Sequence, residues 1–298
     1  MDRTTRIEGK DAVLRHYRDE DYDALCDFLL ELNRNERLHI NWNWARFEWM
    51  AEHPEFDRNA RETIGLWICG ERVVGAAIYD MYFGEAFCGT LSDYSHLYPE
   101  ILDYAWREFR DEKGLGIAVN DTNSFEIKEA LKRGFVPSEQ AETLLRMDLT
   151  RPLPVELPER LSIAELDPAK EPYEIQWLLW QGFDHGEDRE EFEREGLIVP
   201  GVRKHMNPYL SLTARDPMGR PVSCCCLWFY EGSDYAYLEP VCTIPAWRGK
   251  GAAGALIYEG MNRARSLGAK SVYVISDMEF YKHLGFQRDS HYTFYWKT

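Results

Sequence analysis

The chain has 298 residues, 35 of them basic and 51 acidic, which gives a formal net charge of −16. This length suffices for one large domain or two of about 150 residues, and the acidic surplus disfavours binding to a nucleic-acid backbone. No stretch of about 18 apolar residues is present, so no membrane-spanning helix is predicted. The acidity is compatible with a cationic ligand, although acidic surfaces commonly serve only solubility.

The seven cysteines are an odd number and form no C-x-x-C motif. Three of them, Cys224, Cys225 and Cys226, are consecutive within an apolar run. A strand turns neighbouring side chains to opposite faces, so this triplet cannot converge on a metal ion by itself. His185 also lacks a second ligand at metal spacing, and we expect no metal site. Reduced core thiols and a charged N-terminus without a signal-like segment predict a cytoplasmic protein.

The first half of the chain predicts a regular order of strands and helices. The expected elements are a strand over 12–17, a helix over 22–33, a hairpin over 63–81 that turns at Gly70, a helix over 98–114, a strand over 115–121, a helix over 125–135 and a strand over 142–150. The stretch 39–57 is rich in tryptophan, and its spacing suits a helix with aromatic residues on more than one face. Core packing or an aromatic wall for a substrate would both explain it.

A segment with three prolines and no periodicity, 150–160, is predicted to be a linker. The second half then repeats the order of the first. The expected elements are a strand over 161–166, a helix over 171–183, a hairpin over 209–230 that turns at 216–219, a strand over 235–242, a helix over 252–268, a strand over 271–276, a short helix over 278–286 and a last strand over 291–298. The acidic stretch 182–195 is either a solvated loop or a contact for a cationic substrate.

An internal duplication explains the two similar halves. The Gly134-Phe135 pair and the Gly285-Phe286 pair each follow a predicted helix and lie 151 residues apart. We therefore predict two domains, residues 1–150 and 151–298.

A glycine-rich loop, Gly249-Lys250-Gly251-Ala252-Ala253-Gly254, precedes the apolar helix of the second half. It fits the dinucleotide fingerprint G-x-G-x-x-G, but four residues separate it from the preceding strand and only 44 residues follow Gly254. A P-loop is excluded because neither Ser nor Thr follows Lys250. Unpaired N–H groups and the dipole at a helix start bind pyrophosphate, so this loop predicts a phosphate cradle.

The same residues resemble motif A of the GNAT acyltransferase superfamily. Arg248, Gly251 and Ala253 match the family pattern Q/R-x-x-G-x-G/A, and the segment 278–286 resembles the family's F-Y-x-x-x-G-F ending. The resemblance covers residues 161–298. It implies an α/β (α+β) fold of two tandem GNAT-like domains, each with a mixed, mostly antiparallel central sheet flanked by helices.

The resemblance also implies transfer of an acetyl group from acetyl-coenzyme A to an amine by direct attack. Backbone groups of Arg248, Gly249, Lys250, Gly251, Ala252, Ala253 and Gly254 would then form the pyrophosphate cradle, with added positive charge from Arg248 and Lys250. Val241 and Thr243, just past Pro240, would offer a strand edge to the pantetheine amides. Val274 occupies the position where many relatives carry an asparagine, so Ser276 or Asp277 would have to replace that contact.

Two side chains are candidates for the proton transfers. Tyr281 matches the family's tyrosine, the general acid that would protonate the leaving thiolate. Glu239 is the candidate base, and strand alternation would put it on one face with Tyr237 and Val241. A water molecule as the base, or a Glu239 that only orients the substrate ammonium, remain alternatives. A covalent route through Cys242 lacks an adjacent activating base.

The first half lacks the cofactor motif. With an offset of 151, Gly251 falls on Glu100 and Tyr281 on Ala130. Acidic residues at a helix start would repel phosphate. We therefore expect residues 1–150 to be a degenerate GNAT-like domain that shapes the acceptor site or an oligomer contact, residues 151–298 to be the acetyltransferase domain, and coenzyme A to bind once per chain.

The sequence leaves the acceptor open. A small-molecule amine, a polycation, a peptide N-terminus or a lysine would all suit the chemistry, while nucleic acid and membrane are not expected partners. A homo-oligomer is compatible with the sequence. The alternative functions are a non-catalytic acyl-coenzyme A binding or sensing module and, against the acidity of the chain, a transferase that uses charged tRNA.

Overall fold

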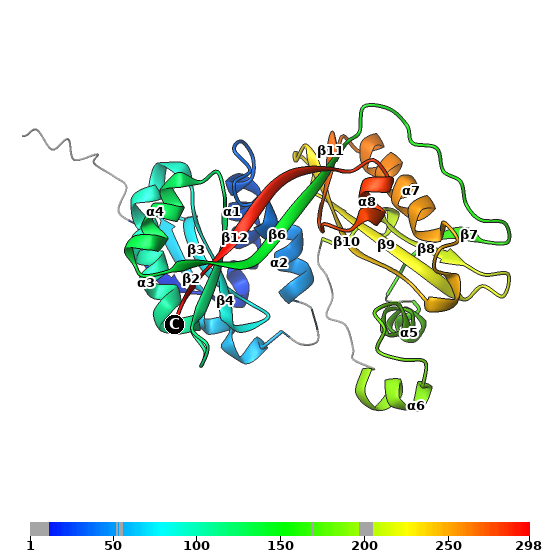
Figure 1. Cartoon of the computed structure of the whole chain (residues 1–298), viewed down its shortest axis with the longest axis horizontal. Coiled ribbons are helices and arrows are strands. Elements are labelled where there is room, and N and C mark those ends of the chain that lie inside the picture. The colour runs from blue at the N-terminus through cyan, green and yellow to red at the C-terminus, as the bar shows by residue number, and fades with distance from the viewer. Residues whose placement is uncertain (1–11, 52, 54–55, 169, 197–204) are drawn as a thin grey trace, which may run out of the picture. The chain divides into compact units, whose positions relative to one another are not determined.

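A computed structural model describes residues 12–51, 53, 56–168, 170–196 and 205–298 (Figure 1). The chain divides into two compact units. Unit 1 comprises residues 1–51, 55–143 and 290–298, and unit 2 comprises residues 52–54 and 144–289. Each unit contains a mixed, mostly antiparallel sheet flanked by helices, as the sequence predicted.

Unit 1 follows the predicted order of elements closely. Its helices and strands are β1 (Val13–His16), η1 (Asp19–Asp21), α1 (Tyr22–Leu32), η2 (Ile40–Trp42), α2 (Trp44–Ala51), η3 (Arg58–Thr63), β2 (Gly65–Cys69), β3 (Arg72–Asp80), β4 (Tyr82–Thr90), η4 (Ser92–Leu97), α3 (Tyr98–Phe109), β5 (Leu115–Asn120), α4 (Ser124–Lys132) and the first part of β6 (Val136–Asp148). The strand β4 was not among the expected elements. It pairs antiparallel with β3 and parallel with β5.

Unit 2 repeats this plan. It contains the end of β6, then β7 (Ser162–Glu165), α5 (Pro172–Gly182), α6 (Arg189–Glu191), η5 (Phe192–Gly196), η6 (Pro208–Leu210), β8 (Ser211–Arg215), β9 (Pro221–Phe229), β10 (Tyr235–Thr243), η7 (Pro245–Trp247), α7 (Ala252–Ser266), β11 (Ser271–Ile275), α8 (Glu279–His283) and the start of β12 (Gln287–Lys297). The sheet order is β6-β11-β10-β9-β8-β7, and only β10 and β11 are parallel to each other.

The last strand of each half pairs within the other unit. The end of β6 lies beside β11, where Leu145 pairs with Val274. The end of β12, drawn in red in Figure 1, lies beside β5, where Tyr295 pairs with Ile117. The compact units therefore differ from the two halves of the sequence. The boundary lies at 143/144 instead of 150, and residues 290–298 complete the sheet of unit 1.

The two faces of the unit 2 sheet carry separate cores. The α7 side chains Leu256 and Met261 pack in one cluster with Cys225 of β9. The α5 side chain Leu178 packs in the other cluster with Cys224 and Cys226, on the opposite face. The cysteine triplet thus alternates across the strand as predicted. All seven cysteines are free, and only Cys69 is not fully buried.

The aromatic stretch of the first half forms less helix than its spacing suggested. Within 39–57 the structure shows the single turn η2 and the eight-residue helix α2, while residues 52, 54 and 55 lie outside the described chain. Trp42 packs against Phe87, and Phe47 packs against Tyr22. These contacts support the core-packing interpretation. Among the described residues, no helix has both the length and the apolar character that crossing a bilayer requires.

Candidate active site

The glycine-rich loop joins η7 to the first turn of α7 in unit 2. Gly249 and Gly251 have φ values of 70° and 87°, in the left-handed region that favours glycine. Gly251 is the N-cap of α7, and no side chain caps the helix. A Cβ atom added at Gly249 would meet nothing within 4 Å, and one at Gly251 would meet only Pro158, at 3.8 Å. The loop is therefore open on the side where a ligand would approach.

The backbone N–H groups of residues 249–254 find no acceptor among the described residues. Ala255 is the first to donate a helical hydrogen bond, to the Gly251 carbonyl (3.1 Å). A run of unpaired N–H groups at the positive end of a 15-residue helix suits a phosphate. The residues present thus fit the pyrophosphate of coenzyme A, and their binding role stays a prediction.

Gly254 has a different role from the other two glycines. A Cβ atom at this position would lie 3.2 Å from Leu284, which follows α8. The Tyr258 hydroxyl on the next turn of α7 donates to the Leu284 carbonyl (2.9 Å). The third glycine therefore lets α7 pack closely on the segment that carries Tyr281, a contact that the motif did not reveal.

The two basic side chains of the loop are both held by protein carbonyls. Arg248 donates from Nε to the Thr243 carbonyl (3.0 Å) and from Nη2 to the Gly182 carbonyl (2.9 Å), and it pairs with Asp184 (2.9 Å). Lys250 donates from Nζ to the Ala246 carbonyl (2.8 Å). Arg248 thus ties the loop after α5 to the cradle. Sequence reasoning missed this link because its partners lie more than 60 residues away.

Beside the cradle, one edge of strand β10 has no strand partner among the described residues. Its parallel pairing with β11 ends at Tyr237 and Tyr273, although both strands continue. Ile244 donates its N–H to Val222 of β9 (3.0 Å), so alternation directs the backbone groups of Val241 and Thr243 toward the opposite, unpaired edge. The Thr243 carbonyl is already taken by Arg248. The remaining groups on this edge suit the amides of a pantetheine chain.

A β-bulge in β10 corrects the expected alternation around Glu239. Leu238 pairs with Leu227, and Val241 pairs with Cys225. Between these two pairs β10 therefore has one more residue than β9. Leu238 and Val241 consequently share a face, and Tyr237 faces the other way with Cys242. The prediction that Tyr237 and Val241 share a face was wrong, because an extra residue reverses the alternation that follows it.

Tyr281 and Glu239 lie within electrostatic reach of each other. Tyr281 is 9% exposed on α8 and packs edge-on against Phe286. Burial raises the pKa of its hydroxyl above the ordinary value, and Cys225 and Glu239 raise it further. Glu239 is half-buried at the bulge, and its carbonyl accepts a hydrogen bond from Nε1 of Trp228 (2.6 Å). The tyrosine therefore stays protonated at neutral pH and can act as a proton donor.

Three other residues considered in the sequence have contacts of their own. Cys242 is buried on the α5 face, with its Sγ 3.4 Å from that of Cys224. Val274 is buried in β11, where Leu145 is its partner. Ser276 accepts a hydrogen bond from the Met278 N–H (3.1 Å), which shapes the turn before α8.

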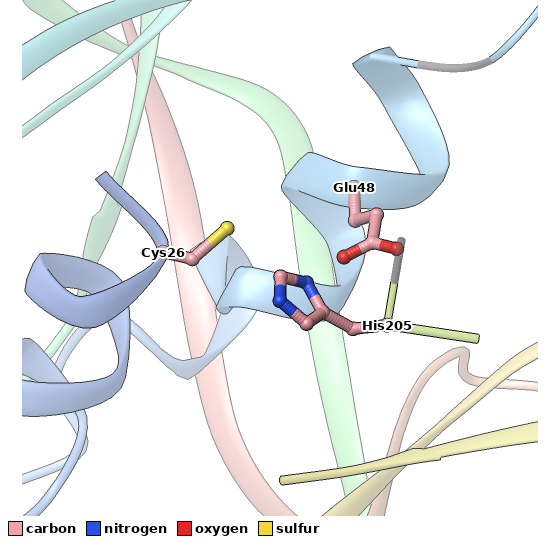
Figure 2. Close-up of side chains that lie close together, drawn as sticks. All are labelled: Cys26, Glu48 and His205. Atoms are coloured by element: carbon pink, nitrogen blue, oxygen red, sulfur yellow. The ribbon is translucent and has the colours of Figure 1, made fainter. Parts of the chain in front are cut away.

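Unit 1 holds buried titratable groups of its own. Figure 2 shows Cys26 of α1 and Glu48 of α2. Burial raises the pKa of the Cys26 thiol, and the Glu48 carboxylate raises it further, which keeps the thiol protonated. His205, also drawn in Figure 2, belongs to unit 2. We assign no reactive role to Cys26.

Comparison with known proteins agrees with this geometry. Residues 170–286 match the model of the acetyltransferase (GNAT) family. No curated protein sequence matches the chain significantly. Among solved structures, the chain is similar to a tandem GNAT protein from the clavulanic acid biosynthesis pathway, with 15% identity, a TM-score of 0.60, and coverage of 95% of this chain and 97% of that one.

Two further structures share the fold. A GCN5-related N-acetyltransferase from Sphaerobacter thermophilus has 14% identity and a TM-score of 0.55 over 97% of this chain and 96% of its own. N-myristoyltransferase from Saccharomyces cerevisiae, with bound myristoyl-CoA, has 12% identity and a TM-score of 0.55 over 96% of this chain and 78% of its own. Residues 170–286 are therefore similar to the GNAT family, and the chain as a whole has the fold of tandem GNAT proteins.

Proposed function

We propose that the chain transfers an acetyl group from acetyl-coenzyme A to a primary amine, and that the second half carries this activity. The family match supports acyl transfer from an acyl-coenzyme A. The observation that carries the proposal is the open run of N–H groups from Gly249 to Gly254 beside the unpaired edge of β10. Free, mostly buried thiols favour a reducing compartment such as the cytoplasm.

Acetyl-coenzyme A supplies an acyl group activated as a thioester, and the protein supplies position and proton transfer. The cradle would hold the pyrophosphate, and backbone groups of Val241 and Thr243 would orient the pantetheine arm. The Tyr281 hydroxyl would donate its proton to the leaving sulfur. Glu239 would accept a proton from the attacking ammonium, directly or through water. The Tyr281 hydroxyl is protonated at neutral pH and can therefore donate, although burial raises its pKa and makes it a weaker acid than a free tyrosine.

The acceptor class follows from charge. Asp184 is fixed beside the cradle by Arg248, and the acidic residues Asp188, Glu190 and Glu191 follow in the same segment. Together with the net charge of −16, these carboxylates would attract a cationic amine to this unit before it loses its proton. We therefore propose a small polyamine or aminoglycoside-like acceptor.

A thiol-release assay with acetyl-coenzyme A against a broad amine library tests the proposal. We expect turnover with cationic amines and none with neutral alcohols. Calorimetry with coenzyme A provides the control for binding. Binding without turnover on any amine would contradict the enzymatic proposal and favour a sensing module, whereas absence of coenzyme A binding would contradict both.

A further inference from the structure

Arg248 makes contacts that its proposed place in the cofactor cradle does not require. Its side chain donates from Nε to the Thr243 carbonyl (3.0 Å) and from Nη2 to the Gly182 carbonyl (2.9 Å). Nη2 also lies 2.9 Å from the Asp184 carboxylate. These contacts engage three of the five N–H donors of the guanidinium, so most of its hydrogen-bonding capacity is directed to the protein.

The end of α5 is built to bring the Gly182 carbonyl within reach of this side chain. Gly182 is the last residue of α5, and a Cβ atom there would lie 2.5 Å from Sγ of Cys242 on β10. A larger residue would therefore push the helix end away from the strand. The carbonyls of a last helical turn lack partners within the helix and form the negative end of its dipole. A guanidinium at this position satisfies both needs.

Asp184 follows α5 in a left-handed backbone conformation, with a φ of 65°. Its N–H and that of His185 donate to the Gln181 and Trp180 carbonyls (3.2 and 3.0 Å), which closes the helix end. Glycine is the usual residue at such a position, because it adopts the left-handed conformation without steric cost. What an aspartate adds here is its carboxylate, and this carboxylate pairs with Arg248.

The pair between Arg248 and Asp184 contributes little to stability. The two side chains are 41% and 66% exposed, and exposed ion pairs are screened by water and salt. The other end of the segment 182–192 is anchored in the core, because Phe192 is fully buried and its ring lies 5.1 Å from that of Trp177. Loss of the Arg248 contacts should therefore free the start of this segment without unfolding unit 2.

We propose that Arg248 is a positioning residue that fixes Asp184 and the start of the segment 182–192 for the amine acceptor. This inference rests on the proposed acetyl transfer and specifies how its acceptor is held. Charge attraction and positioning give opposite expectations for Arg248→Gln. Loss of the cation leaves the Asp184 carboxylate without this partner, so attraction alone would tighten the binding of a cationic amine. Positioning predicts weaker binding, because the segment must then be ordered when the amine binds.

Steady-state kinetics at saturating acetyl-coenzyme A test the proposal with the amine of highest turnover. Arg248→Gln should raise the KM for this amine about tenfold and change kcat by less than about twofold. Arg248→Lys keeps the charge but cannot span the same three partners, so it should raise KM about fivefold. Lys270→Gln removes one positive charge at the other end of α7 and should leave KM unchanged. A KM at or below the wild-type value in Arg248→Gln would overturn the proposal.

Hydrogen exchange on the protein without substrates separates this inference from the proposed function. The amides of Phe183, Asp184 and His185, which donate the bonds that end α5, should exchange about tenfold faster in Arg248→Gln than in the wild type or in Lys270→Gln. The melting temperature should change by less than about 3 °C. Unchanged exchange would overturn the inference even if the wild type acetylates amines. Faster exchange in a protein without turnover would contradict the proposed function and still support the hold of Arg248 on this segment.

Discussion

The starts of α3 and α7 occupy corresponding places in the two units but are built from different side chains. The N-cap of α7 is Gly251, which leaves the backbone N–H groups open. At α3, Tyr98 is fully buried, and Glu100 in the first turn accepts a hydrogen bond from Nε1 of Trp67 (3.1 Å). A carboxylate therefore stands in the first turn of α3, where it would repel a phosphate. We infer from this comparison that a few side chains could close a cradle without changing the fold.

The ends of α4 and α8 show the opposite behaviour, because here the two units are alike. Phe135 donates its N–H to the Ala130 carbonyl, and Phe286 donates to the Tyr281 carbonyl, both at 3.1 Å. Gly134 and Gly285 both have positive φ. The offset of 151 therefore holds at this turn. The backbone is duplicated, while alanine stands in unit 1 where unit 2 has its proposed acid.

Unit 1 also fills its interior with a polar group near this turn. Glu126, in the first turn of α4, lies 3.2 Å from Nε2 of His39, and both side chains are buried. Burial raises the pKa of Tyr98, and its environment includes Glu126 as a hydrogen-bond partner. This arrangement serves structure in unit 1, and we expect it to affect stability but not catalysis.

The largest expected effect is on the stability of unit 1. Glu126→Ala removes the partner of the buried His39 and Tyr98 side chains and should lower the free energy of unfolding by about 3 kcal/mol. Denaturant unfolding measures it, with the exposed Glu139→Ala as a control that should change little. The folded variant should bind coenzyme A as the wild type does. If coenzyme A binding fell by more than the loss of folded protein explains, the claim that Glu126 serves only the structure of unit 1 would be contradicted.

Catalysis should depend on the side chain that unit 1 lacks. Tyr281→Phe should lower kcat about 100-fold while leaving the affinity for coenzyme A unchanged, because only the proton donor is removed. The neighbouring Tyr258→Phe loses a hydrogen bond to Leu284 and should cost about 1 kcal/mol of stability but little turnover. Unchanged steady-state turnover in Tyr281→Phe would remove this residue from the mechanism.

Cofactor binding should depend on the open helix start of unit 2. Wild-type protein should bind one coenzyme A per chain in calorimetry, and Gly251→Ala should weaken binding about tenfold, because a Cβ and a strained φ displace the N–H groups. Gly219→Ala is the matched control, since it has a similar positive φ in the β8–β9 turn and open space around it. Two equivalent sites per chain would contradict a closed cradle in unit 1.

The smallest expected effect is the pH dependence of stability that Tyr281 contributes. The raised pKa in the folded state favours the neutral hydroxyl, so its contribution is complete below the unfolded pKa of about 10 and declines as pH rises toward the folded pKa. Above pH 10, the wild type should therefore lose stability more steeply than Tyr281→Phe. Thermal unfolding from pH 7 to 11 measures this. A stability difference between the two proteins that already changes between pH 7 and 8 would contradict the prediction.

Local features of the chain were predictable from sequence because their causes are local. Gly251 and Gly249 indicated left-handed backbone positions before a helix, and the hairpins at Gly70 and Gly219 followed from their turn residues. The alternation of the cysteine triplet also follows from strand geometry alone. The cradle and Tyr281 could therefore be named, although their catalytic roles are still proposals.

Other features depend on contacts between distant residues, which no local pattern records. The bulge at Glu239 exists because β10 must pair with β9 on both sides of an extra residue, and it reverses the side-chain alternation beyond it. The hydrogen bond from Arg248 to the Gly182 carbonyl and the close packing of Gly254 on Leu284 also join residues that are far apart in the sequence. The last strand, β12, also joins unit 1. It does so through backbone pairing with β5, and such pairing depends on strand register and not on which side chains the strand carries. The sequence by itself determined the repeat, the cradle and the proposed acid, and only tertiary packing decided which strand completes each sheet and which face each side chain meets.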